Sequence, residues 1–161
     1  MAWHAVVTGT QRTPEGSIGL LEASRSYRRD CRQAITDLES SLEAPVAKRT
    51  IDWRLKVIAS LSALRGSFYD DVSFSEGPGG LLEDVMIRAT HLAHDVEKLR
   101  IEQRKLVLAL DAELGRAMLV TETPDVTRAR LRALIQRLFR HRQHAADLVH
   151  DAYEVDIGGT D

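Results

Sequence analysis

The sequence predicts an all-α protein, with the architecture of an antiparallel up-down-up-down four-helix bundle. Apolar residues recur at alternating steps of three and four over four long stretches, which is the period of an amphipathic helix. Glycine and proline residues separate these stretches, and alternation of period two is absent over any useful length. Four long amphipathic helices with short connections are typical of such a bundle.

The first predicted helix spans residues 17–43, with Ser17 as its N-cap after Pro14 and Gly16. Residues 1–16 are polar or extended and are expected to form an N-terminal arm. The seam that faces the core is expected to run through Leu20, Ser24, Tyr27, Cys31, Ala34 and Leu38.

The second predicted helix begins at Thr50 and ends at the glycine-rich segment 77–80. Its seam is expected to contain Leu55, Ile58, Leu61, Leu64 and Phe68, and the pattern continues to Asp71 and Ser75. A third helix is expected to begin at Leu81, with acidic residues in its first turn. Its seam is Leu82, Val85, Ala89, Leu92, Val96, Leu99, Gln103, Leu106 and Leu110.

The fourth predicted helix follows Thr123 as N-cap and Pro124 as its first residue. Its seam contains Leu131, Leu134, Leu138, His141, Ala145, Leu148, Ala152 and Val155. Glycines end the helix, so the bundle is expected to cover residues 17–157 and a short tail residues 158–161.

Composition limits the classes of protein to which the chain can belong. A length of 161 residues suits one domain, and 22 basic against 24 acidic residues give a net charge of −2, which argues against binding nucleic acid through bulk charge. One cysteine excludes an internal disulfide and fits a reducing compartment. No apolar run is long enough for a membrane span, and the first residues do not resemble a secretory signal. We therefore expect a cytoplasmic protein without a membrane partner.

A stripe of arginines on the first predicted helix is a candidate partner-binding surface. Arg25, Arg28, Arg29 and Arg32 lie within about 100° of one another on a helical wheel, opposite the apolar seam. They could hold an acidic partner or a phosphate backbone, or they could form a solvated face together with Asp30. The arginines of the fourth helix scatter around its axis instead.

Each predicted helix also places one polar residue on its apolar seam: Tyr27, Asp71, Gln103 and His141, in chain order. Burying a polar group without a partner costs about 1–3 kcal/mol, so these residues should either satisfy one another or mark a site. Bundles build metal sites from such layers, and Tyr, Asp and His side chains can all ligate iron.

The rise of the α-helix tests whether the four residues can meet. At about 1.5 Å per residue, Gln103 and His141 lie level with each other, and Tyr27 falls within a turn or two of them. Asp71 joins this layer only if the third helix breaks near residues 89–90. The alternative is a hydrogen-bonded core network of Tyr27, Gln103 and His141, with Asp71 capping the loop region.

Two stretches of sequence carry a family resemblance. The first is Phe68-Tyr69-Asp70-Asp71-Val72 through Ser75-Glu76-Gly77-Pro78-Gly79-Gly80, and the second runs from Arg140-His141-Arg142-Gln143 through Ala152-Tyr153 to Gly158-Gly159. With the four-helix layout, they resemble the actinobacterial branch of hemerythrin-like (HHE cation-binding) proteins.

The resemblance implies a metal site with ligands from all four helices. In the family, histidines from all four helices and a glutamate from the second hold a di-iron centre that binds oxygen or nitric oxide or handles peroxide. The positions that correspond to the histidines of the first three helices hold Tyr27, Asp71 and Gln103. Glu76 matches the carboxylate and His141 the fourth-helix histidine. The metal candidates are therefore Tyr27, Asp71, Glu76, His141 and His144, the last on the same side of its helix.

The changed ligand positions favour a hemerythrin-like bundle that has lost its di-iron site and acts as a small binding or regulatory protein. No cofactor is then expected, and the partner is another protein or a second copy of the chain. The alternative is a degenerate iron protein that senses or handles oxygen, nitric oxide or peroxide. An enzyme has less support, because no histidine–carboxylate pair at helical spacing faces a cleft.

Overall fold

The computed structural model describes residues 14–119 and 121–154 of the chain. Every secondary-structure element in these two ranges is a helix, so the all-α prediction is confirmed. The four long helices are α1 (Pro14–Glu43), α2 (Thr50–Glu76), α4 (Ala93–Met118) and α5 (Pro124–Glu154). A short helix, α3 (Leu81–Arg88), and a 3₁₀ turn, η1 (Thr90–Leu92), connect α2 to α4. None of the helices described is long and apolar enough to cross a membrane.

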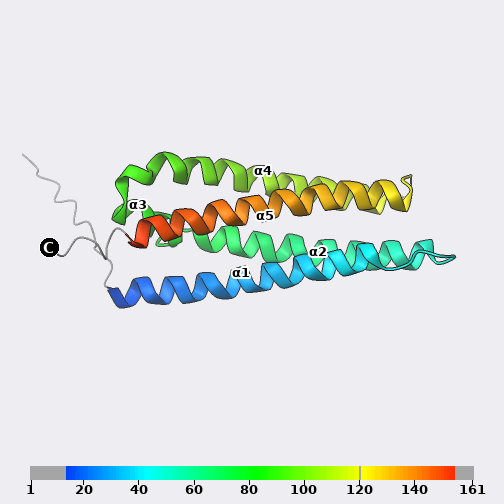
Figure 1. Ribbon diagram of the computed structural model, residues 1–161, viewed down its shortest axis with the longest axis horizontal. Coiled ribbons are helices and arrows are strands. Elements are labelled where there is room, and N and C mark those ends of the chain that lie inside the picture. The colour runs from blue at the N-terminus through cyan, green and yellow to red at the C-terminus, as the bar shows by residue number, and fades with distance from the viewer. Residues whose placement is uncertain (1–13, 120, 155–161) are drawn as a thin grey trace, which may run out of the picture.

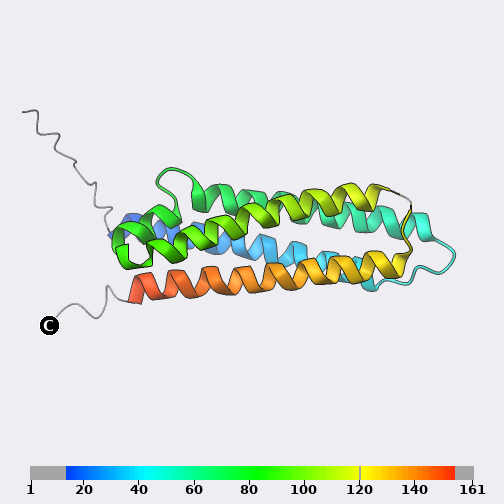
Figure 2. The ribbon, with the colours of Figure 1, turned by 90° about the horizontal axis from the view of Figure 1, so that it is seen from above.

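The four long helices lie side by side along the long axis of the molecule, and each runs opposite to the long helix before it (Figures 1 and 2). Helix α1 packs on α2, α2 packs on α4, and α4 packs on α5. The chain turns back between α3 and α4, at the end of the molecule where α1 begins and α5 ends.

The N-terminal boundary differs from the prediction. Helix α1 begins at Pro14, so residues 14–16 belong to the helix and not to an arm, and Ser17 is a buried helical residue instead of an N-cap. Proline is well suited to the first turn because it has no N–H that would lack a partner there. The remainder of the predicted arm, Val155 and the tail 158–161 lie outside the described residues.

The core consists of two apolar clusters. The larger one joins α1, α2, α4 and α5, and its fully buried side chains include Ile35, Leu38, Leu42, Leu61, Leu64, Phe68, Leu106, Leu110, Leu131 and Leu138. The smaller one lies where α3 and η1 meet α4 and α5, and it includes Leu82, Val85, Leu92, Val96, Leu99 and Leu148. All nine seam positions predicted for 81–110 are buried.

One seam prediction on α2 is wrong. Leu55 is 59% exposed, whereas Trp53 and Val57 are buried. Steps of four from Trp53 through Val57 to Leu61 keep these side chains on one face, and Leu55 lies about 200° from Trp53 on the opposite face. Arg54, next to Trp53, is also buried. A charged residue beside Trp53 obscures the apolar pattern at the start of this helix in the sequence.

The connection between α2 and α3 is the glycine-rich segment 77–80, as predicted. Gly79 has a positive φ of 70°, a conformation that L-residues with a Cβ rarely adopt. A Cβ on Gly80 would lie 2.6 Å from the Phe74 carbonyl oxygen. Glycine is therefore required at both positions for the chain to reverse within this short connection.

The third predicted helix is broken at Ala89, which has φ −134° and ψ 72°. Neither glycine nor proline occurs between residues 81 and 100. A polar cluster holds α3 in place on the N-terminal side of the break. Arg88 donates hydrogen bonds to Asp84 and Ser17, and Tyr153 donates one to Asp84. The Arg88 guanidinium also lies 4.9 Å from the centre of the Tyr153 ring. Contacts to α1 and α5 thus fix the direction of α3.

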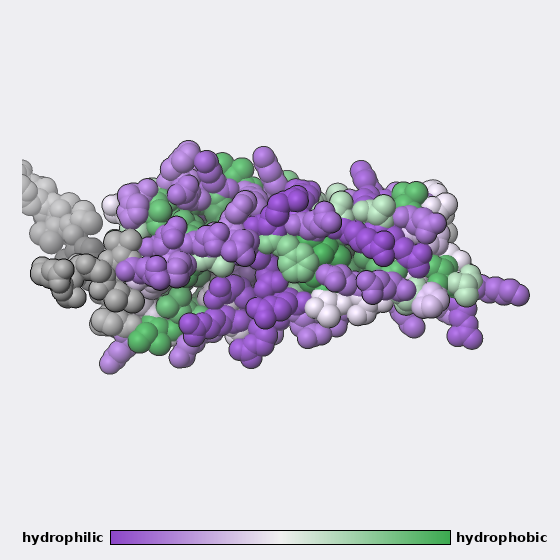
Figure 3. Space-filling view, viewed as in Figure 1, coloured by the Kyte–Doolittle hydropathy of each residue, from purple (hydrophilic) through white to green (hydrophobic). Residues whose placement is uncertain are grey.

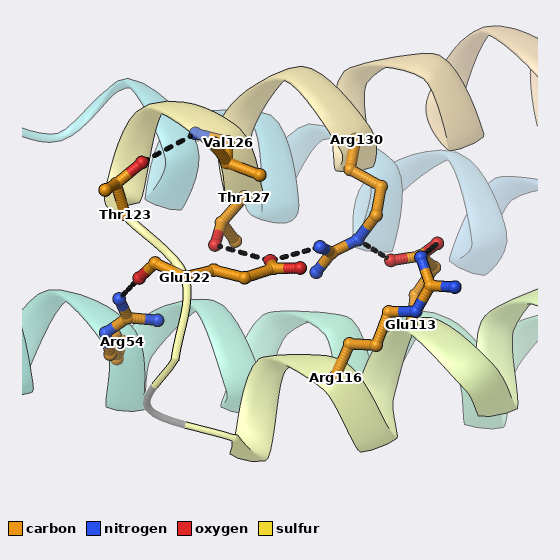
Figure 4. Close-up of polar contacts among 8 residues, drawn as sticks. All are labelled: Arg54, Glu113, Arg116, Glu122, Thr123, Val126, Thr127 and Arg130. Atoms are coloured by element: carbon orange, nitrogen blue, oxygen red, sulfur yellow. Dashed lines mark hydrogen bonds and ion pairs between the residues drawn. The ribbon is translucent and has the colours of Figure 1, made fainter.

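A second polar cluster closes the other end of the molecule (Figure 4). Arg130 on α5 donates hydrogen bonds to Glu113 on α4 and to Glu122 in the α4–α5 connection. Arg54 on α2 donates to the backbone oxygen of Glu122. The hydrogen bond from Arg130 lowers the pKa of the Glu122 carboxyl. These hydrogen bonds join the helices α2, α4 and α5 through the α4–α5 connection.

The start of α5 agrees with the prediction. The Thr123 hydroxyl accepts a hydrogen bond from the Val126 N–H at 3.4 Å, and Pro124 is the first helical residue (Figure 4). This satisfies one of the N–H groups that a helix N-terminus leaves without an intrahelical partner.

We expect Arg130→Ala to lower the free energy of unfolding by about 1–2 kcal/mol, because Glu113 would lose a charged partner in a largely buried position. Urea unfolding followed by circular dichroism measures the change. Arg132→Ala is the matched control, since Arg132 is exposed on the same helix. Equal effects of the two substitutions would contradict the role assigned to Arg130.

Candidate functional site

A small polar cavity lies between the helices. Its volume is about 40 Å³. It is lined by Ser24 and Arg28 of α1, Asp71 and Ser75 of α2, Leu81 and Leu82 of α3, Leu99 and Gln103 of α4, and His141, Arg142, Ala145 and Val149 of α5. Asp71, Gln103 and His141, three of the four polar seam residues, therefore line one cavity. Asp71 reaches it because the helix breaks at Ala89, which was the condition set by the sequence.

The polar side chains around this cavity satisfy one another only in part. Gln103 and His141 are 4% and 3% exposed, yet Gln103 Oε1 accepts no hydrogen bond, and His141 Nδ1 lies next to the carboxylate of Glu102, outside the cavity lining. Tyr27 does not line the cavity, and its ring stacks on Phe74 with 4.8 Å between ring centres. The alternative of a hydrogen-bonded core network of Tyr27, Gln103 and His141, with Asp71 as a loop cap, is therefore wrong.

Charged groups line the cavity without contacting one another. Asp71 forms no ion pair within 4.0 Å with any described residue, although Arg28 and Arg142 line the same cavity. Burial raises the pKa of Asp71 to about 6, and the two arginines act against this rise. Burial, together with neighbouring guanidinium groups, lowers the pKa of Arg28. Two positive charges thus face one carboxylate across the cavity.

The five metal candidates do not converge. His141 and His144 both approach Glu102, a residue that the sequence did not single out, with Nδ1–carboxylate oxygen distances of 3.2 and 3.4 Å. His144 is exposed, and burial lowers the pKa of His141 so that its imidazole is neutral at neutral pH. Glu76 lies outside the cavity lining, with one buried carboxylate oxygen unpaired. The described ranges contain no group of three or more His, Cys, Asp or Glu side chains that could hold a metal ion.

The predicted arginine stripe lines a surface groove between α1 and α5, which we call the arginine groove. Its volume is about 610 Å³. It is lined by Arg25, Arg28, Arg29 and Arg32 of α1 and by Phe139, Arg142, Gln143 and Ala146 of α5. Arg142 and Phe139 were missed, because a single helical wheel cannot show which residues of another helix complete a surface.

The arginines of this groove lack acidic partners, in contrast to most arginines elsewhere. Arg25, Arg29 and Arg32 have no carboxylate within 4.0 Å in the part of the chain that the structure describes. Elsewhere, ion pairs are made by Arg65, Arg88, Arg100, Arg104, Arg116, Arg128 and Arg130. The groove therefore presents a concentrated positive charge that the protein itself leaves uncompensated.

Phe139 gives the groove an apolar neighbour. Its side chain is 47% exposed, which is unusual for a large aromatic residue. It also lines a second depression of about 270 Å³ farther along the same pair of helices, lined by Glu39, Leu42, Glu43, Arg132, Ile135 and Gln136. Figure 3 shows this face of the molecule, where hydrophobic surface is exposed near the middle among hydrophilic side chains.

The arginine groove and the polar cavity share two side chains, Arg28 and Arg142. Arg28 Nε donates a hydrogen bond to the Ser24 carbonyl oxygen at 3.4 Å. Arg142 donates to the Arg28 carbonyl oxygen at 3.3 Å, which ties α5 to α1. The two guanidinium groups thus form the wall between surface and interior.

We expect Asp71→Asn to raise the free energy of unfolding by about 2 kcal/mol near pH 8 and to have no effect near pH 3. The reason is that the folded-state pKa of about 6 lies above the unfolded value of about 3.9, so ionisation destabilises the folded state progressively as pH rises through this window. Denaturant unfolding at several pH values tests this. Asp70→Asn, an exposed neighbour, should show no such trend. A loss of stability in Asp71→Asn at high pH would show instead that the arginines outweigh burial.

No protein-family model, curated protein or solved structure matches this chain.

Proposed function

We propose that the protein is a hemerythrin-like four-helix bundle without the family's di-iron centre, and that it acts as a small binding protein. Its ligand is an acidic segment of a protein partner, held in the arginine groove. The observation that carries this proposal is the set of five guanidinium groups on two adjacent helices, none of which has a described carboxylate within 4.0 Å. Guanidinium groups pair with carboxylates in bidentate geometry and suit interfaces for that reason.

The dimensions of the groove favour a short peptide segment over nucleic acid. Arg25 and Arg32 are seven residues apart, about 10 Å along the helix axis. That distance matches about two turns of a partner helix. Phe139 and the adjoining depression offer an apolar contact next to the charged one. An exposed aromatic residue beside arginines is typical of binding hot spots, and an amphipathic acidic helix fits such a surface.

The charges around the polar cavity support the absence of an iron centre. Arg28 and Arg142 bring two positive charges to the same cavity as Asp71 and His141, and a metal cation there would meet electrostatic repulsion. A guanidinium group has no lone pair free for a metal ion. The degenerate-iron alternative needs Tyr27 as a ligand, and Tyr27 packs on Phe74 instead.

Charge reversal in the groove should abolish partner capture. The double variant Arg25→Glu/Arg29→Glu and the wild type are each immobilised and exposed to lysate of the source cells. We expect the amount of at least one captured protein to fall by about tenfold or more in the variant. Arg137→Glu/Arg140→Glu is the control, because it makes the same change in net charge at exposed α5 positions outside the groove. Quantitative mass spectrometry reads out capture. Identical captured sets for the two double variants would refute the groove as the binding site.

Metal analysis tests the loss of the di-iron centre separately. Protein expressed with supplementary iron and purified without chelator should carry less than about a tenth of an iron per chain, because the ligand set is incomplete. About one or two irons per chain, with a visible absorption band that Tyr27→Phe removes, would instead establish the iron alternative.

A further inference from the structure

The polar cavity is lined by groups that converge on a space without filling it. Gln103 Oε1 and Arg142 Nε are buried and have no hydrogen-bond partner, whereas His141 Nδ1 lies 3.2 Å from a carboxylate oxygen of Glu102. Leaving a buried polar group unsatisfied is unfavourable, and native proteins rarely do so. These two atoms belong to residues of α4 and α5 that line one cavity, which indicates that an occupant takes part in the hydrogen bonding there.

The charge of the lining selects the sign of the occupant. Arg28 and Arg142 contribute two positive charges and Asp71 at most one negative charge, while Gln103 is neutral. His141 is also neutral near pH 7, because burial lowers its pKa. The residues that α3 contributes to the lining are leucines and add no charge. The Glu102 carboxylate, 3.2 Å from His141 Nδ1, lies outside the lining. The lining itself therefore carries a net positive charge, which favours an anion with a single negative charge over a cation.

Two hydrogen bonds hold the guanidinium groups apart from Asp71. Arg28 donates to the carbonyl oxygen of Ser24 within its own helix, and Arg142 donates across to the carbonyl oxygen of Arg28. Each arginine keeps further N–H groups beyond the one so used, and Arg142 Nε is buried and unpaired. The arginines are thus positioned by the backbone and remain available to a guest, without collapsing onto the carboxylate.

The size of the cavity limits the occupant to a few heavy atoms. A volume of about 40 Å³ exceeds what one water molecule needs and is far too small for a nucleotide or a sugar. Arg28 and Arg142 also line the arginine groove, so these two side chains lie between the cavity and the surface. Together these observations fit an ion of the size of chloride, bromide or formate.

We infer that the polar cavity binds a small monovalent anion between the guanidinium groups of Arg28 and Arg142. Gln103 turns its amide N–H₂ toward the ion. This site is distinct from the groove for an acidic partner, because Gln103, His141 and Asp71 do not line the groove and Arg25, Arg29 and Arg32 do not line the cavity.

Chloride is the probe, and the width of its NMR signal is the readout, because exchange with a protein site broadens it. In wild-type protein we expect a broadened chloride signal that bromide narrows by competition. Gluconate at equal ionic strength should not narrow it, since gluconate is too large for the cavity. Gln103→Leu and Arg142→Gln, each verified as folded by circular dichroism, should weaken chloride binding by at least about tenfold through loss of hydrogen bonds to the ion.

Asp71→Asn provides a test in the opposite direction. Removing the competing negative charge should strengthen chloride binding by about fivefold or more, whereas the exposed Asp70→Asn should leave it unchanged. A gain of function of this kind does not arise from partial unfolding.

Two results would overturn the inference. If folded Gln103→Leu and Arg142→Gln broaden the chloride signal as much as wild type, the cavity holds water only. If Arg25→Glu/Arg29→Glu abolishes the broadening while Gln103→Leu does not, the ion lies in the groove. Neither result bears on capture of a protein partner, so the inference and the proposed function fail independently.

Discussion

The break between α3 and α4 is the constraint on which the interior of this protein depends. An unbroken helix from Leu81 would carry Gln103 about 30 Å beyond its first residue, away from the C-terminal turns of α2. Because the chain turns back at Ala89, residues of α2, α4 and α5 line one cavity. The cost of interrupting backbone hydrogen bonds is offset locally by the buried leucine and valine side chains of the smaller core cluster.

Two polar clusters hold the ends of the molecule, and both candidate sites lie between them. At one end, Asp84 and Arg88 join α3 to Ser17 of α1 and Tyr153 of α5. At the other end, Arg130 joins α4, α5 and their connection. In both clusters every carboxylate is paired with an arginine, as buried ionic groups require. The arginine groove departs from this rule, and the departure is what distinguishes it as a candidate site.

Arg28 and Arg142 connect the two candidate sites, because each side chain lines both the groove and the cavity. Their positive charges are only partly balanced by Asp71, whose pKa is raised to about 6 by burial. An anion in the cavity would lower the net positive charge available in the groove, and an acidic partner in the groove would oppose an anion behind it. Electrostatics therefore predicts negative coupling between the two proposed ligands.

Helical periodicity by itself determined the all-α class, the limits of α2 and α5 to within a residue or two where they are described, and the buried seam of 81–110. These follow from local propensity and from one repeating pattern, which a sequence displays directly. The same arithmetic placed Gln103 and His141 at one level and stated what Asp71 would need in order to join them. It placed the Arg25–Arg32 stripe on one face of its helix, and the structure keeps that stripe together as one wall of the groove.

Only the tertiary structure decided that the third helix breaks at Ala89, where no glycine or proline marks the position, and that Arg142 and Phe139 complete the groove. The physical reason is that both outcomes depend on contacts between helices distant in sequence, such as Arg88 with Ser17 and Arg142 with Arg28, and these contacts leave no periodic signal in either helix.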